Sequence, residues 1–166
     1  LKKEIDSDLI FEGPENYIRL DGKTNDDGSI QYSCRKFYSL QYVFIRMFRL
    51  NFIFGNEIEN NILMKNFNHD ERSDVDWISG AAMFFNKVFL NKVGIFDDEN
   101  YFMYGEDQDI CLRTWHNNLK VVYSPQVECF HSYGRKGSSL KISKYSFYQL
   151  FSTIRMFIKF KFNLNR

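Results

Sequence analysis

The sequence predicts an α/β domain in which a mixed sheet is flanked by helices. Short apolar runs bounded by Gly, Pro, Asn and Asp predict strands, and segments with helical spacing of apolar residues predict helices. At 166 residues the chain has the length of one domain and can bury a core. We therefore expect a domain over residues 1–140, followed by a C-terminal helical segment over residues 141–166.

The first half of the chain carries the weaker signals. A short strand is expected before Gly13, and residues 25–28 have the composition of a hairpin turn leading into a strand over 29–34. Residues 35–54 have a wide aromatic face with interspersed Arg, which predicts one or two helices packed on the domain, with a membrane-surface position as the alternative. The Asn-rich segment 55–74 predicts a surface loop.

The second half predicts alternating strands and helices. Residues 76–85 form an apolar run with a Gly-Ala-Ala centre, which predicts a buried strand. Residues 86–93 predict a short helix that ends at Gly94 in the αL conformation. Two further strands are expected at 119–123 and 127–131, separated by a Ser-Pro turn.

A cluster of acids marks the start of the helix in the sequence YFMYGEDQDICLRTW. Glu106, Asp107 and Asp109 follow an aromatic loop and Gly105, and apolar residues then recur with helical spacing. One interpretation is structural: Asp107 caps the helix, and Asp109 pairs with Arg113 one turn later. The other is catalytic, because a carboxylate beside an aromatic pocket has the environment of a general base. The local pattern leaves both open.

The net charge of +1 conceals an uneven distribution. No acid follows Glu128, whereas eight Lys and Arg residues do. Residues 143–162 combine such cations with Phe and Tyr, which predicts a basic aromatic helix. Its aromatic face is expected either to dock on the domain or to lie on an anionic membrane surface. Nucleic-acid binding is not expected, because the aromatic residues have core-like spacing and a pI of about 7.8 is not strongly basic.

Cysteine usage and the absence of long apolar runs bear on the compartment. Cys34, Cys111 and Cys129 are widely spaced without a CxxC pair, so we expect a reducing compartment, with neither a disulfide framework nor a zinc knuckle. No apolar run reaches ~18 residues, so no membrane span is expected. The N-terminal sequence lacks a signal-peptide core and an initiator Met. We expect a cytoplasmic location, at the inner face of the cell membrane if the basic segment binds lipid, and a sequence that is part of a longer chain.

An ordered series of motifs resembles a known enzyme family. The segments DGSIQYSCRKF, DWISGAAMFF, VGIFDD, YFMYGEDQDICLR and VVYSPQVECFHSYGRKGSS follow one another over residues 27–139. Together they resemble the C-terminal half of family 2 inverting glycosyltransferases of the GT-A type. The similarity is greatest to the bacterial rhamnosyltransferase-like branch that builds surface polysaccharides. That branch commonly has Pro where Tyr38 stands here.

The resemblance implies that this chain is the acceptor-binding half of a two-part α/β enzyme. The other half would bind the nucleotide-sugar donor through phosphate loops and an Asp-x-Asp motif, and nothing in this sequence resembles those segments. The implied reaction transfers a sugar, rhamnose being one candidate, to a glycan or lipid-linked acceptor. A divalent metal, Mg²⁺ or Mn²⁺, would bind the donor diphosphate. The alternative is an inactive remnant or adaptor that binds a membrane surface.

The resemblance also implies roles for particular residues. Asp107 would be the general base that takes the proton from the acceptor hydroxyl, and Glu106 would orient the acceptor or support the base. His131 matches a histidine that helps to bind the metal. The expected acceptor pocket contains Trp77, Gly80 and Tyr104.

Several histidines and one aromatic residue have plainer interpretations. Taken without the resemblance, Trp77 is expected in the core, and His131 is expected to be a hydrogen-bonded structural residue at a strand end. His69 and His116 lie in polar sequence surroundings and are assigned no role.

Overall fold

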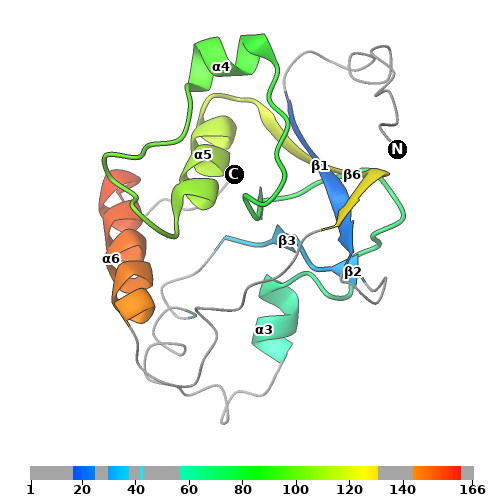
Figure 1. The fold of residues 1–166 in the computed structure, drawn as a ribbon, viewed down its shortest axis with the longest axis horizontal. Coiled ribbons are helices and arrows are strands. Elements are labelled where there is room, and N and C mark those ends of the chain that lie inside the picture. The colour runs from blue at the N-terminus through cyan, green and yellow to red at the C-terminus, as the bar shows by residue number, and fades with distance from the viewer. Residues whose placement is uncertain (1–16, 25–29, 38–41, 43–56, 131–143, 162–166) are drawn as a thin grey trace.

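The computed structural model describes residues 17–24, 30–37, 42, 57–130 and 144–161 (Figure 1). Four predictions therefore lie wholly or mostly outside the described residues. They are the strand before Gly13, the turn at 25–28, the helices within 35–54 and the position of His131.

The main sheet contains four strands in the order β2-β1-β6-β4. β1 (Tyr17–Thr24) and β6 (Lys120–Phe130) are parallel neighbours at its centre. β2 (Ile30–Gln31) pairs with β1, and β4 (Ser73–Asp74) pairs with β6, both antiparallel. The sheet is therefore mixed, and the predicted α/β class with flanking helices is confirmed.

A second, smaller ladder joins β3 (Cys34–Arg35) to β5 (Trp77–Ile78) in antiparallel register. The strand predicted over 29–34 is thus divided between two sheets, and the long buried strand predicted over 76–85 is wrong. Only the first two side chains of that apolar run after Asp76 are buried, because the chain turns outward at its Gly-Ala-Ala centre.

One continuous strand, β6, replaces the two strands predicted on either side of a Ser-Pro turn. Its register against β1 shifts at that point, since Leu20 aligns with Tyr123 but Gly22 aligns with Glu128. Pro125 lies within the shift. A bulge leaves residues unpaired, so the missing N–H of proline breaks no ladder hydrogen bond there.

Two short helices precede the acid cluster. α3 (Glu57–Ile62) lies where a surface loop was predicted, and that prediction is wrong. α4 (Lys87–Val93) confirms the predicted helix; the Asn86 side chain caps it by accepting from the Phe89 N–H at 2.7 Å. Gly94 ends α4 with φ 84° and ψ −169°, a conformation open to glycine but distinct from αL.

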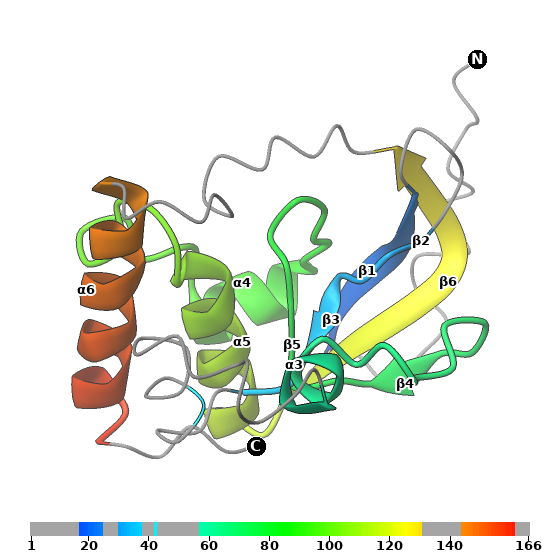
Figure 2. The same cartoon turned by 90° about the horizontal axis from the view of Figure 1, so that it is seen from below.

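Two longer helices complete the fold. α5 (Glu106–His116) lies between α6 (Lys144–Lys159) and the strands, as the two perpendicular views show (Figures 1 and 2). One core cluster joins α5 to the strands, and a second joins α5 to α6. α6 therefore docks on the domain by one face. This was one of the two expectations for the basic aromatic segment.

Two of the three cysteines lie in the core. Cys34 and Cys111 are fully buried in the cluster between α5 and the strands. Among the helices in the described ranges, none is long and apolar enough to cross a membrane.

Candidate functional site

The loop that leads into α5 adopts a backbone conformation that glycine favours. Tyr104 has φ 67° and Gly105 has φ 95°, so two consecutive residues lie in the positive-φ region. A Cβ on Gly105 would lie 3.1 Å from the Tyr101 ring and 3.2 Å from Cβ of Ser152. Close packing and backbone conformation both explain the glycine that separates the aromatic loop from the acids.

α6 holds this loop in place. The Ser152 hydroxyl donates to the Met103 carbonyl at 3.1 Å, and Arg155 donates to the Asn100 carbonyl at 2.6 Å. Tyr101 is buried in the same cluster as Met156 of α6. The approach to the acid cluster is therefore fixed by contacts from a helix far away in the sequence.

The structural interpretation predicted that Asp107 caps the helix, and this prediction is wrong. The N-cap is Gly105, which makes no side-chain capping bond. Instead, Oδ2 of Asp107 accepts from the Gly80 N–H at 3.1 Å, and Oδ1 accepts from the Gln108 N–H at 2.8 Å. Two backbone amides, one from α5 and one from the turn after β5, thus fix the direction of the carboxylate.

The surroundings of Asp107 disfavour its charge. Burial of the carboxyl group and the neighbouring charge of Glu106 together raise the pKa of Asp107 to about 6, while the hydrogen bonds from Gly80 and Gln108 act in the opposite sense. Within the described ranges, no Lys or Arg forms an ion pair with Asp107. The residue as a whole retains some exposed surface.

Glu106 supplies a second acidic group at the same place. Its Oε2 is buried and has no hydrogen-bond partner among the described residues. Both acids belong to the first turn of α5, where unpaired backbone N–H groups and the helix dipole favour negative charge. Glu106 therefore acts on Asp107 through its neighbouring charge.

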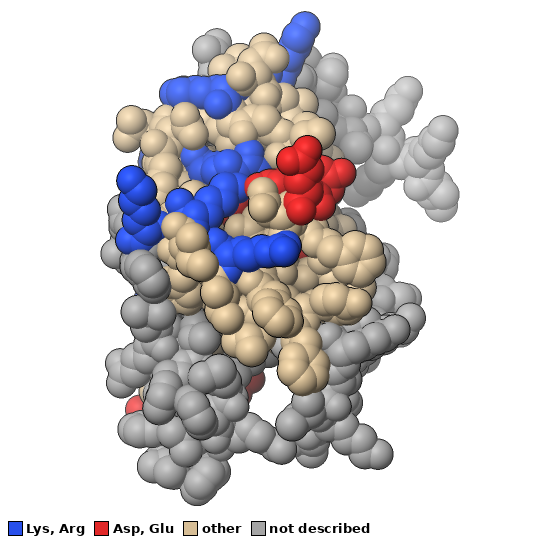
Figure 3. All heavy atoms as spheres, turned by 90° about the vertical axis from the view of Figure 1, so that its left-hand side faces the viewer, with Lys and Arg blue, Asp and Glu red and all other residues tan. Residues whose placement is uncertain are grey.

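Asp109, on the same turn, lies in a different environment. It is fully buried, and its carboxylate forms ion pairs with Arg113 Nε and with Lys159 Nζ, each at 2.7 Å. The predicted pair with Arg113 is confirmed. Lys159 also contacts Asp97 at 2.7 Å, so it joins α6 to both α5 and the preceding loop. Lys and Arg side chains lie beside Asp and Glu side chains on this face of the molecule (Figure 3).

The expected acceptor residues divide into two groups. Gly80 is exposed and adjoins Asp107: a Cβ placed on it would lie 3.3 Å from Cβ of Asp107. Tyr104 is partly exposed in the loop before α5. Trp77, in contrast, is only 7% exposed in the core, and its indole N–H donates to the Lys36 carbonyl at 2.9 Å. Gly80 and Asp107 are therefore brought together, whereas Trp77 presents little surface to a ligand.

His69 lies in a setting that the polar sequence around it did not indicate. Its ring is buried and lies 5.1 to 5.6 Å from the rings of Tyr32, Phe67 and Tyr123. Its neighbours along the chain are mostly polar, but Tyr32 and Tyr123, which are distant in the sequence, pack beside this imidazole. Burial lowers the pKa of His69, so the neutral ring is favoured.

The predicted metal contact cannot be placed, because His131 lies outside the described residues. Among the described residues, no group of three His, Cys, Asp or Glu side chains is placed to hold an ion.

Comparison with known proteins adds no relative. The sequence matches no protein-family model, and it has no significant similarity to a curated protein.

Proposed function

We propose that this chain is the acceptor-binding half of an inverting glycosyltransferase, with Asp107 as its general base. The observation that carries the proposal is the contrast between neighbouring carboxylates. Asp109 pairs with two cations, while Asp107 pairs with none among the described residues, has a pKa of about 6 and keeps some exposed surface. A general base works best when its pKa lies near the operating pH.

The proposed reaction uses few groups of this chain. Asp107 takes the proton of an acceptor hydroxyl while that oxygen attacks the anomeric carbon of a nucleotide-sugar from the face opposite the leaving group. The bond to the nucleoside diphosphate breaks, and the configuration at the anomeric carbon inverts. The Gly80 and Gln108 amides hold the carboxylate in one orientation, which lowers the entropic cost of reaching the reacting geometry. Glu106 supports the base, because its neighbouring charge helps to raise the pKa of Asp107.

Residues outside the described site would bind the donor and its metal. Mg²⁺ and Mn²⁺ prefer several oxygen ligands, and in the intact enzyme the nucleotide-binding half would supply most of them. His131 stays a predicted contact to that metal. When bound, the metal would neutralise charge on the leaving diphosphate. Rhamnose as the sugar, and a glycan or lipid-linked acceptor in bacterial surface polysaccharide synthesis, rest on the sequence resemblance.

Acceptor-dependent release of nucleoside diphosphate tests the proposal directly. The intact enzyme, expressed from the gene with whatever coding sequence precedes Leu1, would be incubated with a panel of nucleotide-sugars with and without acceptors. We expect release only with an acceptor, and a rate that rises as pH passes through about 6, because Asp107 must be ionised to act. Absence of transfer across the panel, or a rate that is flat between pH 5 and 8, would refute the role of Asp107.

A further inference from the structure

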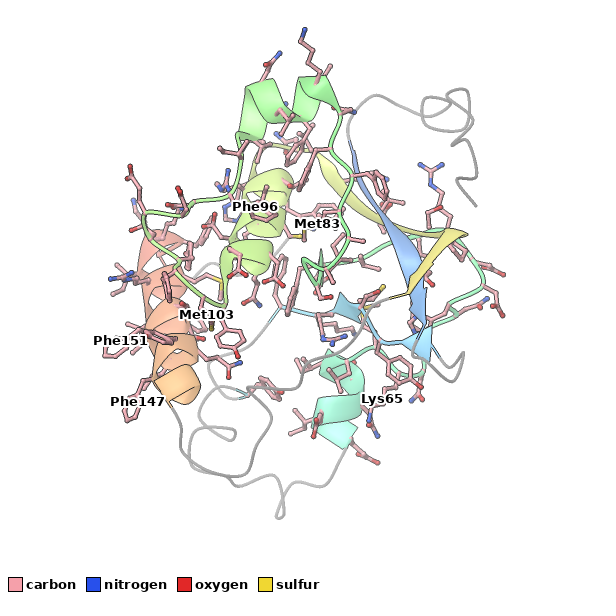
Figure 4. The ribbon with its side chains drawn as sticks, in the orientation of Figure 1. Lys65, Met83, Phe96, Met103, Phe147 and Phe151 are labelled. Carbon is pink, nitrogen blue, oxygen red and sulfur yellow. The ribbon has the colours of Figure 1, made fainter. Side chains whose placement is uncertain are left out.

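The face of α6 that points away from the domain carries an apolar stripe. Met156 and Phe157 pack inward against α5. On the outer side, Phe147 and Phe151 project away from the molecule (Figure 4). Two isoleucines continue this line toward the end of the helix. We call the stripe the α6 seam, and its members, which are 45% to 65% exposed, are Phe147, Phe151, Ile154 and Ile158.

The spacing of the α6 seam is that of a coiled coil. Its residues follow one another at intervals of four, three and four positions along the helix. This alternation keeps the side chains on one narrow side of a helix, where they fit against a second helix. A helix that packs on a broad surface presents a wider apolar stripe, of about 100° or more. The spacing therefore indicates a second helix as the partner of this face.

α6 is itself a helix that fits this seam. Two copies can run antiparallel about a two-fold axis between Phe151 and Ile154, so that the same surface of each copy meets the other. Phe151 then faces the partner's Ile154, and Phe147 faces the partner's Ile158. Each layer joins one aromatic ring to one smaller aliphatic side chain. Such layers fill space more evenly than the layers of a parallel pair, in which Phe meets Phe and Ile meets Ile.

We propose that the α6 seam is the interface of a homodimer in which two copies of α6 pack antiparallel. The residues that flank the seam agree with this arrangement. Tyr148 and Arg155 lie on the same side of the seam, and both are exposed. Antiparallel pairing brings Arg155 of each copy to the partner's Tyr148, and a guanidinium is attracted to the face of an aromatic ring.

The dimer also borders the loop that leads into α5. Phe102 is 79% exposed, and its ring centroid lies 5.6 Å from that of Tyr148. Phe102 thus extends the flank of the seam, and the partner's helix covers it in the dimer. The loop from Asn100 to Gly105 is thereby held by α6 of its own chain and bordered by α6 of the partner.

The exposed area of the seam and its flank is sufficient for a stable dimer. The four seam residues, Phe102 and Tyr148 are 38% to 79% exposed. Together they expose about 600 Å² of apolar surface, given that an aromatic side chain carries roughly 150–250 Å². Homodimer interfaces are about 65% apolar, so this surface corresponds to about 900 Å² buried on each copy. A stable interface buries about 800 Å² on each partner.

Sedimentation velocity of the full chain over a dilution series tests the proposal. Interfaces of this size have dissociation constants from micromolar to picomolar, so we expect a dimer at about 50 μM. Phe151→Gln should raise the dissociation constant about a hundredfold or more, because each copy loses a buried Phe side chain from the central layers. A monomer at this concentration would overturn the proposal. So would a dimer whose dissociation constant is unchanged by Phe151→Gln.

A matched pair of aliphatic substitutions controls for general effects on the surface. Ile154→Gln lies in the α6 seam at 45% exposure, and Val88→Gln changes a residue of α4 at 48% exposure. Only the first should weaken the dimer. If both weakened it equally, the contact would not be specific to the seam and the proposal would fail.

Cysteine cross-linking tests the orientation of the two helices. Chains with Phe147→Cys and chains with Ile158→Cys would be mixed, treated with an oxidant and resolved on a non-reducing gel. We expect a cross-linked dimer from the mixture, because antiparallel pairing brings these two positions together. Cross-linking of Phe147→Cys chains with themselves alone would indicate parallel pairing and refute the proposed arrangement. The unsubstituted chain is the control for the native thiols of Cys34, Cys111 and Cys129.

A vesicle assay separates the dimer from a bilayer contact. If the chain were a monomer that binds phosphatidylglycerol vesicles, and Phe151→Gln abolished that binding, the seam would contact lipid and the proposal would be wrong. A dimer that covers the seam should bind vesicles equally well with and without Ile154→Cys cross-linked to Phe151→Cys, because the seam is already buried.

The dimer does not depend on the proposed function. The α6 seam and Asp107 belong to different helices, so Asp107→Asn should leave the dissociation constant unchanged. Sugar transfer by a monomeric chain would reject the dimer and leave the enzyme assignment standing. A dimer without transfer would reject the enzyme assignment and leave the interface standing.

Discussion

Two carboxylates on the first turn of α5 face different regions of the molecule. Asp109 faces α6 and is fully buried between Arg113 and Lys159. Asp107 faces the turn after β5, and its hydrogen-bond partners among the described residues are backbone N–H groups, those of Gly80 and Gln108. A buried acid that pairs with two cations holds the fold together. An acid with amide donors alone, beside another acid, is held close to its protonation equilibrium. Asp107 and Asp109 are only two residues apart on α5, yet one is a candidate base and the other a structural ion-pair partner.

The largest expected effect is on catalysis at Asp107. In the intact enzyme, Asp107→Asn should lower the turnover number by ~100-fold to ~10,000-fold, because the amide cannot accept the hydroxyl proton. Donor affinity should hardly change. Steady-state kinetics with donor titration would measure both. Asp98→Asn, which alters an exposed acid of the preceding loop, is the matched control and should retain activity. Near wild-type turnover of Asp107→Asn would show that Asp107 is not the general base.

The next largest effect concerns stability at Asp109. Asp109→Asn leaves Arg113 and Lys159 without their shared carboxylate, and breaking a buried pair costs ~3–5 kcal/mol. The loss should fall near the lower end, because Lys159 is partly exposed and still contacts Asp97. Denaturant unfolding would measure the change against Asp98→Asn. A loss below about 1 kcal/mol, the size of a surface pair, would mean that the contacts to α6 are weak.

Stability as a function of pH should report the raised pKa of Asp107. The folded pKa of Asp107, about 6, lies above its ordinary value near 3.8, so the folded state binds the proton more tightly. Its contribution is greatest at low pH and falls as pH rises from about 4 to about 6, by roughly 2–3 kcal/mol.

The Asp107→Asn variant isolates that contribution. His69 acts in the opposite sense: burial lowers its pKa, so its contribution is lost as pH falls below 6.5. This effect is common to wild type and Asp107→Asn, so it cancels when the unfolding free energies of the two proteins are subtracted at each pH. A difference that does not change between pH 4 and 7 would contradict the raised pKa of Asp107.

Local sequence signals predicted those features that depend on nearby residues. Helical spacing after the acid cluster gave α5, and the interval of one turn gave the pair of Asp109 with Arg113. The short segment that ends at Gly94 and the aromatic spacing of residues 143–162 likewise predicted α4 and α6. In each case the sequence signal lies within a few positions along the chain.

The features that were not predicted depend on distant partners. Lys159 reaches Asp109 only because α6 packs on α5, and no sequence period links the two. α3 is polar and short, but its end is fixed where the Lys36 N–H donates to the Ile62 carbonyl. β6 runs through Pro125 because β1 and β4 border it on either side. Tertiary contacts override weak local preference in all three cases.

The smallest expected effect contrasts two glycines near these carboxylates. Gly80→Ala places a Cβ 3.3 Å from Cβ of Asp107, a tight but tolerable contact. The base should shift by a few tenths of an ångström, which lowers turnover up to about tenfold and changes stability by less than about 1 kcal/mol. Gly94→Ala, at φ 84°, should do the reverse: positive φ costs an alanine about 1 kcal/mol or more while activity persists. Kinetics and unfolding of both variants would measure this. If Gly80→Ala kept full activity and Gly94→Ala lost it, the reacting group would lie nearer the end of α4 than the turn after β5.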